Sequence, residues 1–256
     1  MDIQTKPVRI RRPQLDEPSP LLAHLDELRK CLIVSAIAVI VCSCVAYAWV
    51  DPIIRDIAKP IGKLYFTTPM EAFWSRLKLA FFVGIFLSMP LVLSQVWRFV
   101  HRGLFPKEKR FIFWLTTVSF ALFAMGSAFC YFVVLPAGVK FLMEYGSDVL
   151  LPMISITRYL SFVAGMVFSF GIIFELPLVI AIMVKAGMLK SITLRKNRRY
   201  AIVLVFIAAA ILTPTPDAFN QLLMAVPLLV LYEIGVIVAR IIESRGGIKD
   251  GKDRIS

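Results

Sequence analysis

Long apolar runs alternate with short charged segments along the chain, and this pattern predicts helices that cross a membrane. A spanning helix needs about 20 mostly apolar residues to cross a hydrocarbon core of about 30 Å. Five runs contain no charged residue, and a sixth contains only Glu175. The runs are residues 31–50, 79–97, 111–139, 159–184, 200–216 and 218–232. We therefore predict an all-α polytopic membrane protein with six transmembrane helices.

The last two runs are separated only by the short turn TPTPD at residues 213–217. Because the connection is so short, we expect these two helices to form a tight antiparallel hairpin. Both are short: the 15 residues of 218–232 would rise only about 22 Å as a helix. Local thinning of the bilayer is therefore expected over the hairpin.

The orientation follows from the basic residues between the runs. Of the 29 Lys and Arg residues, 22 lie in the segment before the first run, in the connections after the second and fourth runs, and after Ala239. The other seven lie on the opposite side. Lys and Arg accumulate on the cytoplasmic side, so both termini are predicted to be cytoplasmic. The net charge of +12 is then a topology signal, and nucleic-acid binding is not needed to explain it.

Composition excludes an ordinary soluble enzyme. The chain is 59% hydrophobic and 18% charged, whereas soluble domains are about 45–50% apolar and about 25% charged. Its four cysteines lie in or beside apolar runs, where they act as small hydrophobes. We expect no enzymatic activity, no metal site and no cofactor. The expected domains are a cytoplasmic tail at 1–18, a membrane domain at 19–240 and a second cytoplasmic tail at 241–256.

An amphipathic surface helix is predicted at residues 19–30, ahead of the first span. Ser19 can cap it, and an apolar stripe recurs at helical spacing. The stripe consists of Leu21, Leu25, Leu28 and Leu32. Glu27 falls nearly opposite this stripe. It is either a solvated carboxylate that pairs with Lys30 or a group that faces a partner.

Two further carboxylates lie where a charge needs an explanation. Glu108 is the only acid of the basic connection 98–110, where it either balances local charge or can accept a guanidinium from a ligand. Glu175 lies inside a span, which costs at least about 2.5 kcal/mol. It either faces a cavity or partner, or is hydrogen-bonded internally and stabilises the bundle. Pro177 removes a backbone hydrogen bond beside it, which predicts a kink.

A polar patch is expected at the turn of the short hairpin. Asp217 follows Pro216 at the start of the last run, which is an ordinary helix start. Thr213 lies in the same turn, and Gln221 lies one helical turn beyond Asp217 on the same face. Such a patch can bind a polar group on another membrane helix.

Six short motifs occur in a fixed order. They are HLDELRK (24–30), GLFPKEKR (103–110), YFVVLP (131–136), SFGIIFELP (169–177), LTPTPDAFNQ (212–221) and VPLLVLYEIG (226–235). In order and spacing the chain resembles the TatC family, the multi-spanning receptor component of the twin-arginine protein translocase. The resemblance covers essentially residues 21–240.

The resemblance implies a receptor for twin-arginine signal peptides of folded proteins. By motif position Glu27 and Glu108 would hold the arginine pair at the cytoplasmic face. Arg29 would orient the amphipathic helix, and Phe99 would pack the connection. Carboxylates suit this role because the planar arginine fork makes bidentate bonds that lysine cannot reproduce.

The resemblance also implies partners and a location. Single-span partners of the TatA and TatB type would bind near Thr213 and Gln221, with Asp217 beside them, and several copies of the chain would associate. Glu175 matches an intramembrane glutamate of the family, and Pro60 a structural proline of the first outer loop. The family exports folded proteins across the bacterial cytoplasmic (inner) membrane, driven by the proton-motive force.

Two other functions remain open on the residues alone. One is a proton-coupled secondary transporter of a small solute, with Glu175 as the proton site. Against it, the two halves show no inverted repeat, and Glu175 is the only mid-membrane ionisable residue. The other is a structural membrane subunit whose charged segments only dock partners.

Overall fold

The computed structural model describes residues 20–62, 64–66, 68–104, 109–143, 153–212 and 218–245. Within these ranges the regular structure is helical, apart from a single bridge between Tyr65 and Ser155, and short turns join the helices. The elements are α1 (Pro20–Tyr47), α2 (Val50–Ala58), α3 (Pro69–Leu104), α4 (Lys109–Phe129), the π-helix η1 (Cys130–Val134), α5 (Leu135–Met143), α6 (Ile156–Phe174), α7 (Leu176–Lys185), α8 (Ser191–Lys196), α9 (Arg198–Leu212) and α10 (Ala218–Arg245). The predicted all-α fold is confirmed.

Several helical stretches are long and apolar enough to cross a membrane. In the described part of the chain there are five: Leu25–Tyr47, Pro69–Val100, Ile112–Phe141, Ile156–Lys185 and Gln221–Ser244. They correspond to five of the six predicted spans, so a multi-spanning membrane protein is confirmed.

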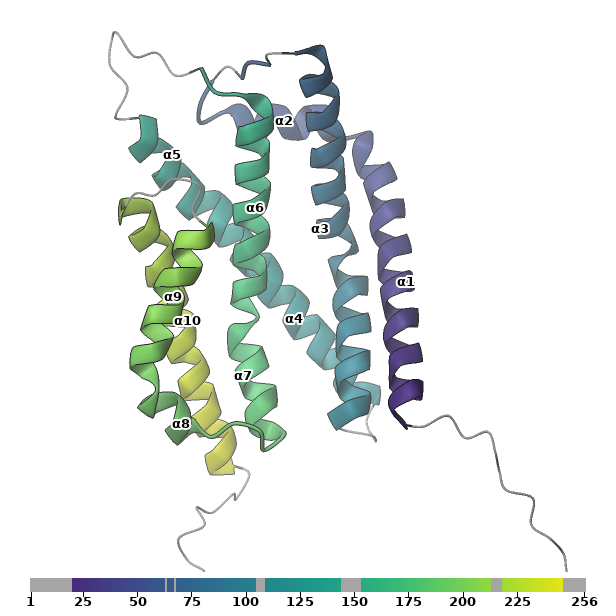
Figure 1. The fold of residues 1–256 in the computed structure, drawn as a ribbon, viewed down its shortest axis with the longest axis vertical. Coiled ribbons are helices and arrows are strands. Elements are labelled where there is room, and N and C mark those ends of the chain that lie inside the picture. The colour runs from purple at the N-terminus through teal and green to yellow at the C-terminus, as the bar shows by residue number, and fades with distance from the viewer. Residues whose placement is uncertain are drawn as a thin grey trace, which may run out of the picture.

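The remaining predicted span corresponds to α9. This helix has 15 residues, or about 22 Å, which is less than the hydrocarbon thickness of about 30 Å. It packs along α10 (Figure 1), while the turn at 213–217 lies outside the described residues. The sixth span and the hairpin therefore stay predictions.

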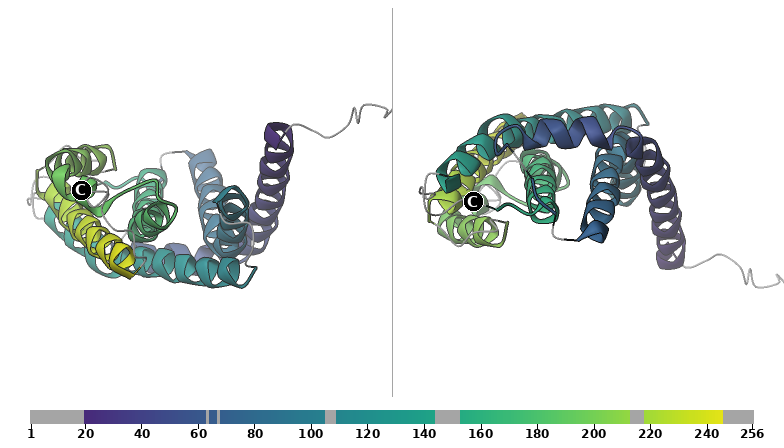
Figure 2. Two further views of the ribbon diagram at one scale, coloured as in Figure 1. Left: turned by 90° about the horizontal axis from the view of Figure 1, so that it is seen from below. Right: turned by 90° about the horizontal axis from the view of Figure 1, so that it is seen from above.

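The helices stand in a curved row (Figure 2). The row runs from α1 at one end, through α3 and the α6–α7 pair, to α9 and α10 at the other. The α4 helix crosses the row obliquely and contacts both α3 and α6 (Figure 1). The short α2 lies across one end of the bundle, which we call the α2 end.

Two apolar clusters hold this row together. One joins η1 and α5 to α6, α9 and α10, with Phe170 and Met224 fully buried. The other joins α3, α4 and α7 around Phe123. By contrast, only 6% of the most apolar part of α1 is buried, so α1 depends on its packing against α3.

That packing passes through a close helix crossing at Gly84. A Cβ atom on Gly84 would lie 2.1 Å from the Ser43 hydroxyl and 2.5 Å from the Ser43 Cα. The Ser43 hydroxyl donates back to the Val39 carbonyl on its own helix, at 2.7 Å. Small residues let helix backbones approach closely in membranes, and Gly84 and Ser43 do so here.

The helical run 156–185 is interrupted at Glu175, as Pro177 predicts. Helix α6 ends at Phe174, α7 begins at Leu176, and Glu175 forms the turn between them. The Glu175 amide donates to the Ile172 carbonyl at 3.0 Å, one residue short of the α-helical pattern. At this junction the Glu175 side chain contacts Ser119 of α4.

The segment predicted as a separate surface helix is continuous with the first span in α1. Its leucine stripe is exposed, with Leu25 at 59% and Leu32 at 61%, while Glu27 is half-buried. Glu27 is thus less exposed than the stripe that the helical wheel places opposite it. It is the carboxylate face, however, and not the leucine face, that turns toward the protein.

Candidate functional site

A pocket of about 490 Å³ lies between α1 and α3, at the bundle end opposite α2. We call it the Glu27 pocket. Glu27 and Phe99 both line it, so the structure brings together two of the predicted site residues. Its other lining residues are Lys30, Cys31, Val34, Gln95 and Arg98.

The Glu27 pocket combines one carboxylate with two cations. Lys30 and Arg98 line it with Glu27, so the residues that line the pocket carry a net positive charge. The side chains of Phe99 and Val34 provide an apolar wall. Arg29, two residues after Glu27, is exposed and does not line the pocket.

The second predicted carboxylate, Glu108, lies outside the described residues. Helix α3 ends at Leu104 and α4 begins at Lys109, directly after Glu108.

Glu175 lies in a different site, which we call the Glu175 pocket. Its side chain is 9% exposed, and its Oε1 accepts a hydrogen bond of 2.7 Å from Ser119 on α4. Its Oε2 has no hydrogen-bond partner among the described residues, and neither does the buried Trp97 Nε1. Both residues line a pocket of about 300 Å³ that is otherwise apolar. One oxygen of this pocket-lining carboxyl is therefore hydrogen-bonded, and the other has no partner among the described residues.

The same part of α3 contributes side chains to both pockets. Arg98 and Phe99 face the Glu27 pocket, whereas Trp97 and Val100 face the Glu175 pocket. The sequence analysis missed both Ser119 and Trp97. The only available signal for Ser119 was a hydroxyl within an apolar run.

The predicted polar patch is described only at Gln221. Its Nε2 donates to the Phe206 carbonyl on α9 at 3.2 Å, so this side chain links α9 to α10. Thr213 and Asp217 lie outside the described residues. Pro60 lies exposed in the turn that follows α2, where its missing amide hydrogen prevents the helix from continuing.

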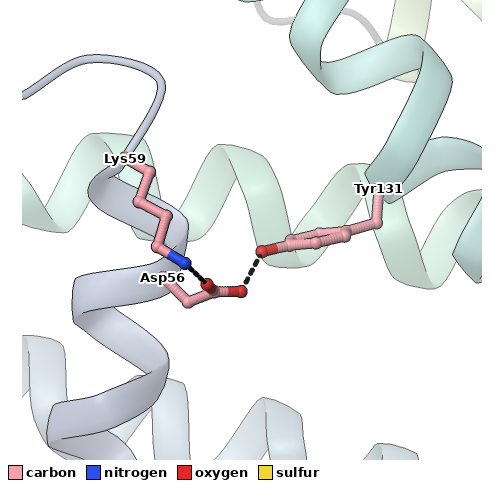
Figure 3. Close-up of polar contacts among 3 residues, drawn as sticks. All are labelled: Asp56, Lys59 and Tyr131. Atoms are coloured by element: carbon pink, nitrogen blue, oxygen red, sulfur yellow. Dashed lines mark hydrogen bonds and ion pairs between the residues drawn. The ribbon is translucent and has the colours of Figure 1, made fainter.

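A polar cluster at the α2 end was not predicted. The Tyr131 hydroxyl of η1 donates to Asp56 Oδ2 of α2 at 2.6 Å, and Lys59 donates to Oδ1 (Figure 3). The Lys59 hydrogen bond, helped by that of Tyr131, lowers the pKa of Asp56 below its ordinary 3.8. The cluster ties α2 to the middle of the bundle. Asp56 and Tyr131 are 75 residues apart, so no local pattern reveals the contact.

No group of three His, Cys, Asp or Glu side chains lies close enough to hold a metal ion in the ranges that the structure describes.

Comparisons with known proteins identify the family of this chain. Residues 23–227 match the family model TatC, described as Sec-independent protein translocase protein. The TatC of Carboxydothermus hydrogenoformans is 42% identical over 234 residues, which cover 90% of this chain and 96% of that protein. The TatC of Aquifex aeolicus is 38% identical over 230 residues, covering 87% and 95%.

A solved structure matches this chain along most of its length. It is a crystal structure of the twin-arginine translocase receptor TatC, which superposes with a TM-score of 0.77 at 37% identity. The match covers 86% of this chain and 99% of that one. The chain therefore belongs to the TatC family of Sec-independent protein translocase proteins.

Proposed function

We propose that this chain is the signal-peptide receptor of a twin-arginine translocase, and that the Glu27 pocket binds the arginine pair. The observation that carries the proposal is the half-buried Glu27 carboxylate, which lines a pocket with Phe99 between α1 and α3. It is supported by the similarity to the solved twin-arginine translocase receptor TatC.

The charges of the pocket explain why two carboxylates are needed. Lys30 and Arg98 repel an incoming guanidinium, and Glu27 alone offsets one of them. Glu108, in the segment between α3 and α4, supplies the second negative charge in this proposal. Two carboxylates then hold two guanidinium groups by bidentate, charge-assisted bonds, whereas lysine offers only a point charge. Arg29, which is exposed, orients the start of α1.

The topology that goes with this function has six spans and both termini in the cytoplasm. The Glu27 pocket then opens at the cytoplasmic face of the bacterial inner membrane, where unexported proteins present their signals. Helices α9 and α10 form the hairpin, and the bilayer thins beside α9, which has only 15 residues, whereas α10 is longer than first expected, with 28. The strong bias of Lys and Arg toward one side supports this orientation.

The same proposal assigns the hairpin to partner recruitment. Thr213, Asp217 and Gln221 form the polar patch that binds single-span partners of the TatA and TatB type. The described helices form an open curved row that does not close into a ring (Figure 2). Transport of folded proteins, driven by the proton-motive force, therefore requires these partners and self-association of the chain.

Peptide binding tests the receptor proposal. The purified chain in detergent is titrated with a signal peptide that carries an arginine pair and with its lysine-pair twin. We expect the arginine peptide to bind more tightly and Glu27→Ala or Glu108→Ala to remove that preference. Asp26→Ala is the matched control, because Asp26 is exposed on the same helix and does not line the pocket. Equal binding of both peptides, or an equal loss in the control, would contradict the proposal.

A proton-coupled transporter of a small solute is the second candidate, because Glu175 lines a cavity and its Oε2 has no hydrogen-bond partner among the described residues. The apolar walls of the Glu175 pocket offer a polar solute little besides Glu175 and Trp97. Solute flux into proteoliposomes that is abolished by Glu175→Gln would favour this function over the receptor.

A further inference from the structure

A second groove lies between α1 and α3, about 20 Å along α1 from Glu27 and toward the α2 end. Its volume is about 960 Å³, near the upper end of the roughly 300–1,000 Å³ typical of small-molecule sites. Its walls are mostly aliphatic and aromatic side chains, which include Ile40, Tyr47, Phe73, Trp74, Leu77 and Phe81. These six side chains are all exposed. We call this site the α1–α3 groove.

Lys78 is the charged residue that lines the α1–α3 groove. Its side chain is exposed, and it forms no ion pair within the described part of the chain. The nearby Arg76 differs, because it pairs with Asp51 at 3.0 Å. An ammonium beside an apolar groove, without a counter-ion, is stabilised by an anion that reaches it from outside the protein.

The depth of Lys78 matches the level of lipid headgroups. The α3 span has 32 residues, or about 48 Å, so about 9 Å projects at each end beyond a core of about 30 Å. Lys78 lies nine residues from Pro69, about 14 Å along α3, which puts its Cα about 5 Å inside the core. A lysine side chain of about 6 Å can extend back to the interface. Tyr47 and Trp74 line the same groove, as aromatic residues do at membrane interfaces.

We propose that the α1–α3 groove binds one phospholipid, with an acyl chain along the apolar walls and the phosphate on Lys78. A phospholipid carries one anion and a long apolar chain, which is the combination that the groove presents. A membrane helix would cover the walls but leave Lys78 without a counter-ion. The bound lipid fills space between α1 and α3 on the α2 side of the Gly84 crossing, where α1 has little protein packing.

Native cysteines allow a direct test in the full-length chain. Cys44 lines the groove and is exposed, whereas Cys42 lies about 200° around the same helix and does not line it. The delipidated chain in detergent is alkylated with N-ethylmaleimide, with and without added phosphatidylglycerol, and each cysteine is followed by mass spectrometry. We expect the lipid to slow alkylation of Cys44 at least fivefold and to leave Cys42 unchanged.

Variants at Lys78 separate a bound lipid from general coating of the surface. Lys78→Gln should need about fivefold more lipid for the same protection of Cys44, the equivalent of about 1 kcal/mol for one basic residue at an anionic lipid. Lys78→Arg should restore protection, and Lys140→Gln, an exposed cation outside the groove, should have no effect.

Four results would overturn the proposal. They are no protection of Cys44, equal protection of Cys42, the same lipid requirement in Lys78→Gln as in the unchanged chain, and protection of Cys44 by inorganic phosphate alone.

Discussion

The crossing of α1 and α3 at Gly84 yields a sharp prediction, because the Glu27 pocket lies between the same two helices. In Gly84→Ala the new Cβ would lie 2.5 Å from the Ser43 Cα, whereas ordinary contacts begin at 3.4 Å. Since a Cα cannot rotate away as a side chain does, the two backbones must separate by about 0.9 Å. Overpacking of this kind costs about 1–3 kcal/mol.

The displacement at the pocket can be bounded from the helix geometry. If α1 moves as a parallel body, Glu27 shifts by the same 0.9 Å. If α1 instead pivots at Tyr47, Ser43 lies about 6 Å and Glu27 about 30 Å from the pivot, so the shift at Glu27 reaches about 4–5 Å. Either value exceeds the tolerance of about 0.5 Å for a preorganised site.

Gly84→Ala is therefore expected to lower the thermal unfolding temperature and to weaken binding of an arginine-pair signal peptide. Both quantities can be measured on the purified chain in detergent. Gly165→Ala is the matched control, since a Cβ on Gly165 in α6 meets nothing within 4 Å. If Gly84→Ala unfolds at the same temperature and binds the peptide as tightly as Gly165→Ala, the argument from the crossing is refuted.

Two further substitutions test the buried and the exposed polar contacts. Ser119→Ala removes the hydrogen bond to Glu175 and should lower the free energy of unfolding by about 1 kcal/mol. The control is Thr117→Ala, which should change the free energy of unfolding little, because the Thr117 hydroxyl is exposed and donates to the Phe113 carbonyl of its own helix. Equal effects of the two substitutions would contradict a stabilising contact between Ser119 and Glu175. Tyr131→Phe removes a hydrogen bond that lowers the pKa of Asp56. A lowered folded-state pKa stabilises the fold above pH 3.8 and loses that contribution as the pH falls toward the folded-state value, so stability measured from pH 5 to pH 3 should fall less steeply in Tyr131→Phe than in the unchanged chain.

The spans could be predicted because each contains an apolar run of at least 15 residues with at most one charge, but their ends could not. Helix α3 begins at Pro69, ten residues before the apolar run. The prediction missed this first part of α3 because it counted only charge-free residues, and Arg76 and Lys78 lie there. It likewise missed that α1 extends back to Pro20 without a break. Local chemistry did predict the interruption at Glu175, since a proline two residues later acts on its own helix.

The candidate site was predictable only in part. The motif positions identified Glu27 and Phe99, and the structure brings both to one pocket. The contact of Ser119 with Glu175 spans 56 residues of sequence. It depends on where the oblique α4 crosses α6, and no local periodicity encodes that crossing.

The central claim, that the Glu27 pocket binds the arginine pair, can be tested with a native cysteine. Cys31 lines this pocket, and Cys44 lines the distant α1–α3 groove. A signal peptide with a thiol-reactive group beside its arginine pair is incubated with the purified chain, and the modified cysteine is identified by mass spectrometry. The account predicts an adduct at Cys31 that is lost in Glu27→Ala and absent with the lysine-pair peptide. An adduct at Cys44 instead, or equal labelling of Cys31 by both peptides, would contradict it.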